Sequence, residues 1–255
     1  MKPSLIRTLL RDPVHGLVSI FNQASLTLSR WTRQRYQLAV PFATYAPWLS
    51  DPEFMELYQA LKKDCLVSLY QCWELWTLGK QKGAESGDVL EVGVWRGGSS
   101  VILGRALRSV DSGAKLFCCD SFAGLVKIGA CDPHNSEGEL SDAGPEEVTA
   151  RLEQFGVSNF ELLCGVFPEE TSVRIADRRF SLCHIDVDTK QSAEDVFEWV
   201  WPRMNNGGVV VFQDYGFHRT PGISELVDGL RGRPGLTVVH NLNGNALIFR
   251  HAEAN

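Results

Sequence analysis

The sequence lacks the features of a membrane-spanning or exported protein. Of its 255 residues, 44% are hydrophobic and 22% are charged, which is ordinary for a globular chain. No apolar stretch reaches the length of a bilayer span. No hydrophobic segment with a small-residue cleavage site follows the basic residues Lys2 and Arg7. We therefore expect a cytoplasmic protein with no membrane partner.

Clustered metal ligands and a strong positive charge are also missing. The seven cysteines include no CxxC pair, which argues against a structural zinc site. Their odd number and scatter favour reduced thiols. The formal net charge is −6, and binding to a phosphate backbone needs clustered cations. Nucleic acid is therefore not expected as a partner.

The chain changes character near residue 85. Residues 1–85 have a helical texture, and we interpret them as an extension for oligomerisation or for covering the acceptor side of a site. The first 35 residues are basic, which leaves two interpretations open: a membrane-surface or partner-binding arm, or a solvated or dimer-forming helix. Residues 52–80 carry an apolar stripe at helical spacing, with Phe54, Leu57, Leu61, Cys65, Leu66 and Leu69.

Residues 86–255 alternate short apolar runs with helical segments, the pattern of a doubly wound parallel α/β sheet. Leu236–Asn241 and Asn245–Arg250 flank an LNG turn and predict an antiparallel hairpin at the sheet edge. Together they predict seven strands. The predicted parallel strands are Asp88–Gly93, Lys115–Asp120, Phe160–Gly165, Phe180–Asp186 and Gly208–Asp214, and the predicted helices are Ser99–Val110, Pro145–Phe155 and Ser192–Met204.

The loop EVGVWRGG after the first predicted strand contains Glu91, Gly93 and Gly97. The dinucleotide fingerprint GxGxxG needs a second glycine where this loop has Trp95, so a pyrophosphate would lack open backbone. The spacing suits a cofactor without phosphate, such as S-adenosylmethionine, with Glu91 near its cationic amino-acid end. The alternative is a glycine-rich turn that binds nothing.

Asp120 ends the second predicted strand. A carboxylate there can accept hydrogen bonds from both ribose hydroxyls of a nucleoside cofactor. Ser121 and Phe122 follow, and an aromatic ring could lie beside the adenine. The alternative role for Asp120 is a helix N-cap.

Three acidic residues follow the fourth and fifth predicted strands: Asp186, Asp188 and Asp214. Adjacent parallel strands end at the same edge of the sheet, so these carboxylates are expected to converge and could hold a divalent cation such as Mg²⁺. Capping of the following helices is the alternative, and it is equally good for Asp188.

His134, in the irregular stretch 129–144, could act as a base if that loop is a lid, whereas His184 is expected to be a packed strand residue.

Several segments resemble one family when taken in order. They are EVGVWRGGSS (Glu91–Ser100), CDSFAGL (Cys119–Leu125), HIDVD (His184–Asp188), PRMNNGGVVVFQDYG (Pro202–Gly216) and TPG (Thr220–Gly222). Together they resemble the macrocin-type sugar O-methyltransferases, which include enzymes acting on deoxysugars of macrolide and aminocoumarin antibiotics. The resemblance covers roughly residues 85–250.

This resemblance implies the seven-stranded class I methyltransferase fold, S-adenosylmethionine, Mg²⁺ and a homodimer or higher homo-oligomer. It implies a small-molecule acceptor with a hydroxyl group, on a sugar or another natural-product scaffold. By position, the metal ligands correspond to Asp186 and to Gln213 and Asp214 in FQDYG, and Asp186 is also suited to act as the base.

Gln213 departs from the family, which usually has a second acid there. An amide oxygen can coordinate Mg²⁺ but adds no charge, so the sequence predicts weak metal binding. There are two alternatives. One is metal-free chemistry with Asp186 or His134 as base, and the other is a non-catalytic member of the fold. A nicotinamide-dependent oxidoreductase is disfavoured by Trp95 and by the terminal hairpin.

Overall fold

The computed structural model describes residues 13–32 and 45–252. Two compact units divide at Pro47 and Trp48. The first contains helix α2 (Pro13–Thr32), on which Val14, Leu17 and Phe21 are exposed. The basic residues Lys2, Arg7, Arg11, Arg33 and Arg35 lie outside the described residues, so the two interpretations of the basic arm stay open.

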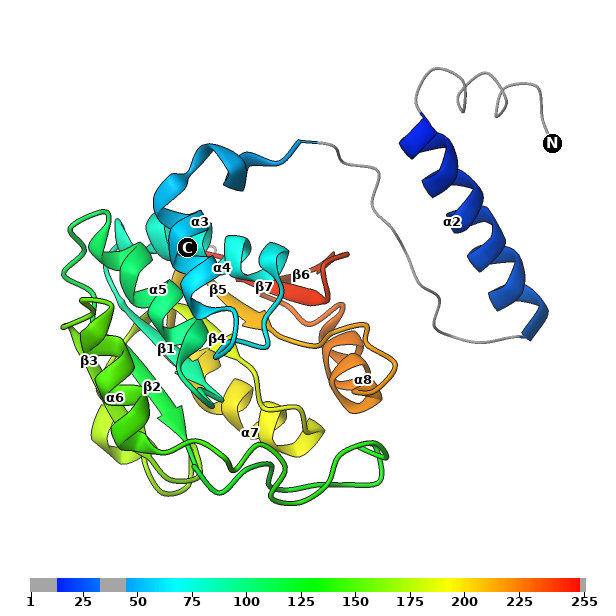
Figure 1. Cartoon of the computed structure of the whole chain (residues 1–255). Helices are drawn as coiled ribbons and strands as arrows, with labels where there is room; N and C mark the ends of the chain where they lie inside the picture. The colour runs from blue at the N-terminus through cyan, green and yellow to red at the C-terminus, as the bar shows by residue number, and fades with distance from the viewer. Residues whose placement is uncertain (1–12, 33–44, 253–255) are drawn as a thin grey trace. The chain divides into compact units, whose positions relative to one another are not determined.

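The second unit is built on a seven-stranded sheet with the order β3-β2-β1-β4-β5-β7-β6 (Figure 1). The first five strands run parallel, and β7 pairs antiparallel with β5 and β6. This confirms the predicted doubly wound fold and its terminal hairpin. The strands are β1 (Asp88–Val92), β2 (Leu116–Asp120), β3 (Phe160–Cys164), β4 (Phe180–Ile185), β5 (Met204–Phe212), β6 (Leu236–Asn241) and β7 (Asn245–Arg250).

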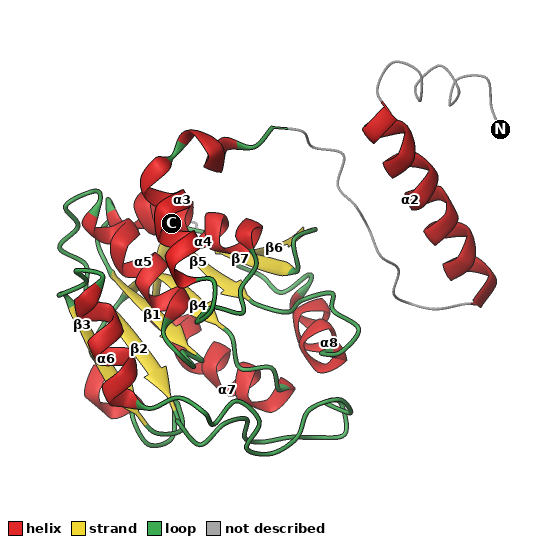
Figure 2. Cartoon of the chain, viewed as in Figure 1, coloured by secondary structure: helices red, strands yellow, loops and turns green. Residues whose placement is uncertain are grey.

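Helices cover both faces of this sheet (Figure 2). Side chains alternate along each strand, so β1 sends Val89 to one face and Leu90 to the other. One core lies under α3 (Pro52–Leu61), α4 (Leu69–Gly83), α5 (Gly98–Arg108) and α6 (Pro145–Gln154). The other lies under α7 (Lys190–Val200) and α8 (Pro221–Leu230). Helices α3 and α4, which the sequence assigned to the extension, therefore belong to the compact unit of the sheet.

The predicted apolar stripe over residues 52–80 falls on two helices and on the connection between them. Asp51 caps α3 by accepting a hydrogen bond from the Phe54 amide at 3.0 Å. Ser68 and Gln71 form a capping box that starts a new helix. Cys65 and Leu66 lie in the connection, and Leu66 is 70% exposed.

Two other boundaries differ from the prediction. Helix α7 ends at Val200 rather than near Met204, because a short 3₁₀ turn, η3 (Trp201–Arg203), follows, and its Pro202 has no N–H to continue the helical bonding. Strand β5 accordingly begins at Met204. Helix α8 was not predicted, although Thr220 and Pro221 mark its start.

Candidate active site

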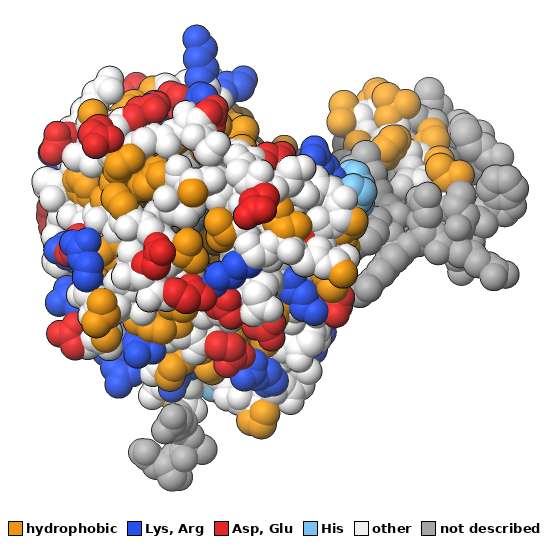
Figure 3. Space-filling view, turned by 90° about the horizontal axis from the view of Figure 1, so that it is seen from below, with side chains coloured by type: hydrophobic (Ala, Val, Ile, Leu, Met, Phe, Trp, Pro, Cys, Tyr) orange, Lys and Arg blue, Asp and Glu red, His pale blue; other side chains and the backbone are white. Residues whose placement is uncertain are grey.

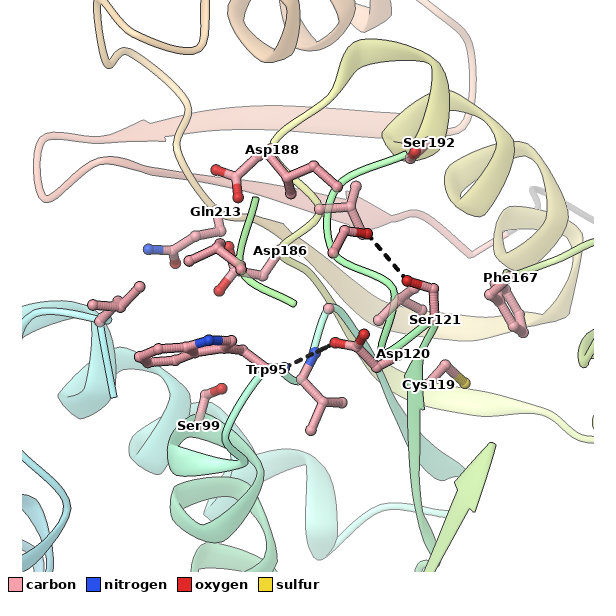
Figure 4. Close-up of a pocket in the computed structure, with 18 of the residues that line it drawn as sticks. Trp95, Ser99, Cys119, Asp120, Ser121, Phe167, Asp186, Asp188, Ser192 and Gln213 are labelled. Carbon is pink, nitrogen blue, oxygen red and sulfur yellow. Dashed lines mark hydrogen bonds between the residues drawn. The ribbon is translucent and has the colours of Figure 1, made fainter. Parts of the chain in front are cut away.

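A pocket of about 180 Å³, open to solvent, lies at the carboxyl ends of the parallel strands. It is centred between β1 and β4, where the strand order reverses and where ligands bind in open α/β sheets. In Figure 4, Asp186, Asp188 and Gln213 lie on one side of the pocket, and Asp120 and Ser121 lie on the other. The pocket thus joins the predicted cofactor residues to the predicted carboxylates.

The β1 loop requires glycine where it passes β4. Gly93 has a φ of +89°, and a Cβ there would lie 1.7 Å from the Asp186 carbonyl oxygen. Gly97, with a φ of +81°, caps α5, and it does not line the pocket. Trp95 lines the pocket with a φ of +47°, a strained conformation for a bulky residue. Strain of this kind often accompanies a ligand site.

Asp120 holds the β1 loop through its carboxylate. One oxygen accepts hydrogen bonds from the Val94 and Trp95 amides at 2.7 and 2.8 Å (Figure 4). The other oxygen accepts from the Phe122 amide at 2.8 Å. An ionised carboxylate offers about four acceptor positions, so roughly one is left for a ligand hydroxyl. Asp120 is therefore a loop organiser here rather than a helix N-cap.

The two residues after Asp120 have different positions. Ser121 lines the pocket, and its hydroxyl donates to the Gly124 carbonyl at 3.1 Å. Phe122 does not line the pocket but packs against the core under α3–α6. Val166 and Phe167, which follow β3, line the wall instead.

Glu91 lies beneath the pocket and does not line it. Its fully buried carboxylate accepts hydrogen bonds from the Ser100 hydroxyl and, at 2.9 Å, from Nδ1 of His184 when that nitrogen is protonated. Glu91 and His184 are paired across β1 and β4. His184 is thus a packed strand residue, as predicted, and the role of Glu91 toward a cofactor stays a prediction.

Asp186, Asp188 and Asp214 converge in the pocket, as the strand order predicted. Burial, followed by the charge of Asp188, raises the pKa of Asp186 well above its ordinary value. Burial, followed by the charge of Asp186, raises the pKa of Asp214 to about 9. Asp188 and Asp214 have φ values of +58° and +64°. These carboxylates repel one another and favour protonation or a compensating cation.

The residues around these carboxylates fit a hard cation. Gln213 is 7% exposed, and its Oε1 is buried without a hydrogen-bond partner among the described residues. An unpaired amide oxygen beside crowded carboxylates provides the all-oxygen donor set that Mg²⁺ prefers. In the described part of the chain, no group of three or more His, Cys, Asp or Glu side chains could hold a metal ion. Asp186, Asp188 and Asp214 therefore do not form such a group by themselves.

His134 is exposed and does not line the pocket. Its ring lies 6.4 Å from the ring of His218, centroid to centroid. Its loop is tied to the site, because Asn135 donates to the Asp188 carbonyl at 2.9 Å, and Asp142 accepts from the Trp95 indole at 2.7 Å. The loop therefore borders the pocket, while its action as a lid and the catalytic role of His134 stay predictions.

Sequence reasoning missed one wall of the pocket. Residues 64–67, in the connection between α3 and α4, line it directly. The capping pair of Ser68 and Gln71 was the signal that a loop precedes α4. The tryptophans of this region, by contrast, are core residues: Trp76 is fully buried, and Trp48 and Trp73 pack against the core.

Comparison with known sequences decides the family. The family model described as macrocin-O-methyltransferase matches residues 79–250, about two thirds of the chain. The chain belongs to the macrocin O-methyltransferase family. This confirms the resemblance seen in the motifs and makes the chain, by family, an O-methyltransferase.

A relative from Streptomyces olivaceus, 8-demethyl-8-(2,3-dimethoxy-alpha-L-rhamnosyl)-tetracenomycin-C 4'-O-methyltransferase, is 31% identical over 66% of this chain and 67% of its own length. Mycinamicin III 3''-O-methyltransferase from Micromonospora griseorubida is 28% identical over 59% of this chain. The match spans 63% of that relative.

Solved structures show the same fold. The O-methyltransferase NovP superposes with a TM-score of 0.61 at 22% identity, covering 71% of this chain and 79% of that one. TomG from Streptomyces achromogenes, solved in complex with S-adenosylmethionine, superposes with a TM-score of 0.50 at 18% identity, covering 92% of this chain and 98% of that one.

Acidic and basic side chains are interspersed over the face in Figure 3. Among the described helices, none has the length and apolar character needed to cross a membrane.

Proposed function

We propose that this chain transfers the methyl group of S-adenosylmethionine to a hydroxyl of a sugar or another natural-product scaffold. One observation carries the proposal: a single pocket joins the Gly93–Trp95 loop and Asp120 to the carboxylates after β4 and β5. The methyl donor and the group that accepts the proton must lie on the two sides of the hydroxyl that reacts, and this pocket offers both sides.

The cofactor side is formed by the β1 loop, Asp120 and Ser121. S-adenosylmethionine supplies an electrophilic methyl group when it is bound. The remaining acceptor position of Asp120 would take a ribose hydroxyl, and Trp95 would close the β1 side. The pocket holds the two reactants in line, and such positioning can supply most of the rate enhancement.

Asp186 is proposed as the base. Its pKa is raised by burial and by Asp188, and a carboxylate with a raised pKa accepts a proton more readily near neutral pH. Asp186 would take the proton of the acceptor hydroxyl as that hydroxyl receives the methyl group, and the demethylated donor would leave as the second product. His134, exposed and outside the pocket lining, is the weaker candidate.

A divalent cation is proposed to assist, held by Asp186, Asp214 and Gln213. It would lower the pKa of the acceptor hydroxyl. The unpartnered Oε1 of Gln213 and the repelling carboxylates support this assignment. Binding is expected to be weak, because Gln213 adds no charge. Homo-oligomerisation through the N-terminal residues stays a further prediction.

Methyl transfer from S-adenosylmethionine with a deuterated methyl group tests the activity. The protein is incubated with a panel of glycosylated natural products and free sugars, and products are analysed by mass spectrometry. A labelled product with at least one hydroxylated acceptor is expected, and its loss in Asp186→Asn ties it to this pocket. Absence of cofactor binding would overturn the proposal.

A further inference from the structure

Two thiols lie together in the wall of the pocket, and the proposed reaction uses neither. Cys65 lies in the α3–α4 connection and lines the pocket, and Cys72 lies fully buried in the first turns of α4. Their sulfur atoms are 3.8 Å apart. The Val67 carbonyl lies 3.4 Å from the Cys72 sulfur and can accept its proton. Cys65 is therefore the reachable member of a preassembled pair.

We propose that Cys65 and Cys72 form an oxidisable dithiol. Their disulfide displaces the α3–α4 connection, which lines the pocket, and thereby weakens ligand binding in the pocket. This inference rests on the proposed function, because it concerns the same pocket. The oxidant is a small peroxide that enters through the pocket.

The chemistry balances with hydrogen peroxide. The Cys65 sulfur attacks one peroxide oxygen and breaks the O–O bond, which gives a sulfenic acid and releases water. The Cys72 thiol then attacks that sulfur, which forms the S–S bond and expels a second water. Both thiol protons leave in the water molecules, and the peroxide is reduced as the sulfurs are oxidised.

The surroundings favour Cys65 as the attacking thiol. The hydrogen bond from Cys72 lowers the pKa of Cys65. Burial raises the pKa of Cys118, Cys119 and Cys183, which are fully buried. Near the surface, the Glu225 carboxylate raises the pKa of Cys131, and burial raises that of Cys164. The thiolate is the reactive form, so Cys65 should react first.

Bond formation must move the wall. A disulfide has an S–S length of about 2.05 Å, well below the 3.8 Å separation. Cys72 is fixed in α4, so the displacement falls on Cys65 and on Leu66 and Val67, which also line the pocket. A Cβ on Gly98 would lie 2.4 Å from the Cys65 Cβ, so Cys65 packs directly on the start of α5. Movement of Cys65 therefore reaches the cofactor loop.

The test treats the reduced full chain with hydrogen peroxide, alkylates the remaining thiols and analyses peptides by mass spectrometry. The peptide between Lys63 and Lys80 contains both cysteines, so the disulfide makes it lighter by two hydrogens and blocks its alkylation. We expect this product before oxidation of Cys164, with at least about a tenfold loss of affinity for S-adenosylhomocysteine by calorimetry, which corresponds to ~1.4 kcal/mol. Dithiothreitol should restore the affinity.

Cys65→Ser and Cys72→Ala each remove one partner and should make binding insensitive to peroxide, whereas Cys164→Ser should keep the wild-type response. If one of these two variants fails to fold, the other still tests the inference. The inference is overturned if Cys164 oxidises first and the 65–72 pair stays reduced, or if the disulfide forms and binding is unchanged. If the reduced protein binds no S-adenosylhomocysteine, the proposed function fails, and the mass analysis still decides whether the disulfide forms.

Discussion

The carboxylates on the two sides of the pocket have opposite surroundings. On the β1–β2 side, Asp120 accepts three backbone hydrogen bonds and holds the cofactor loop in place. On the β4–β5 side, burial and the charge of Asp188 raise the pKa of Asp186, burial and the charge of Asp186 raise the pKa of Asp214, and the Oε1 of Gln213 has no partner among the described residues. The carboxylate on the β1–β2 side has its hydrogen bonds within the protein, whereas the carboxylates on the β4–β5 side have no compensating positive charge in the described part of the chain.

Under the proposed function, this difference would separate binding of the methyl donor from activation of the acceptor. A carboxylate with its hydrogen bonds in place is preorganised and needs no reorganisation when a ligand arrives. Crowded carboxylates in a buried site gain most from a cation. We therefore expect the cofactor side to bind without metal and the β4–β5 side to respond to Mg²⁺, pH and charge changes.

The largest effect is expected from Asp186→Asn. The change removes the proposed base and one metal ligand, so turnover should fall about 10²–10⁴-fold, the usual contribution of a positioned base. Binding of S-adenosylhomocysteine should stay within a few-fold of wild type, which is the internal control. Steady-state kinetics check the first outcome and calorimetry the second. Near-normal turnover would show that Asp186 is not the base.

Asp120→Ala tests the other side. Loss of its hydrogen bonds frees the Val94 and Trp95 amides and removes the proposed ribose acceptor. Affinity for S-adenosylmethionine should fall about tenfold to a hundredfold, because a hydrogen bond to a charged group is worth roughly 1.5–3 kcal/mol. The exposed, distant Asp177→Ala is the control and should bind normally. Equal affinity in both variants would remove Asp120 from the cofactor site.

Gln213→Glu sharpens the comparison by adding a charge where the family usually has one. A third carboxylate should lower the Mg²⁺ concentration for half-maximal activity by about tenfold, since ligand charge tunes the affinity of such sites. Gln213→Leu, which removes the amide oxygen, should raise the Mg²⁺ concentration needed for half-maximal activity. Activity that is indifferent to EDTA in the wild type and in both variants would favour the metal-free alternative.

The smallest effect is on stability. The pKa of Asp214 is about 9 in the folded chain against an ordinary value of 3.8, so the folded state holds this proton more tightly than the unfolded state. Its contribution is complete below pH 3.8 and is lost as the pH rises through about 9.

In EDTA, Asp214→Asn should therefore lose less stability than wild type between pH 5 and pH 8. The difference in Tm should be about 2–4 °C for a domain of this size, if roughly 1 kcal/mol is recovered. Differential scanning calorimetry gives both curves. Parallel pH curves would mean that Asp214 does not titrate in this range.

Much of the fold was predictable because it follows from local patterns. Short apolar runs between helical segments predicted the strands, and the turn at Leu242–Gly244 predicted the bounds of the hairpin strands to the residue. The parallel arrangement of adjacent strands predicted that Asp186 and Asp214 lie at the same edge of the sheet. The helix break near Cys65 and the boundary at Met204 depend on a capping box and on a proline rather than on periodicity.

The site was predictable only where a residue follows a strand directly. The position of Asp186 follows from the topology, but the inward turn of Glu91 toward Ser100 and His184 depends on packing across two strands and a helix. Likewise, Phe122 packs against the core with a φ of +52°, a backbone conformation that the sequence does not reveal. The wall at residues 64–67 comes from a loop whose contacts are all distant in sequence.

The most direct test of whether the cofactor side binds its ligand independently of metal is titration with S-adenosylhomocysteine, in EDTA and again in excess MgCl₂. Isothermal calorimetry should give one site per chain and the same Kd in both buffers, because the β1–β2 side is complete without a cation. Failure to bind in either buffer, or binding only with Mg²⁺, would contradict the account.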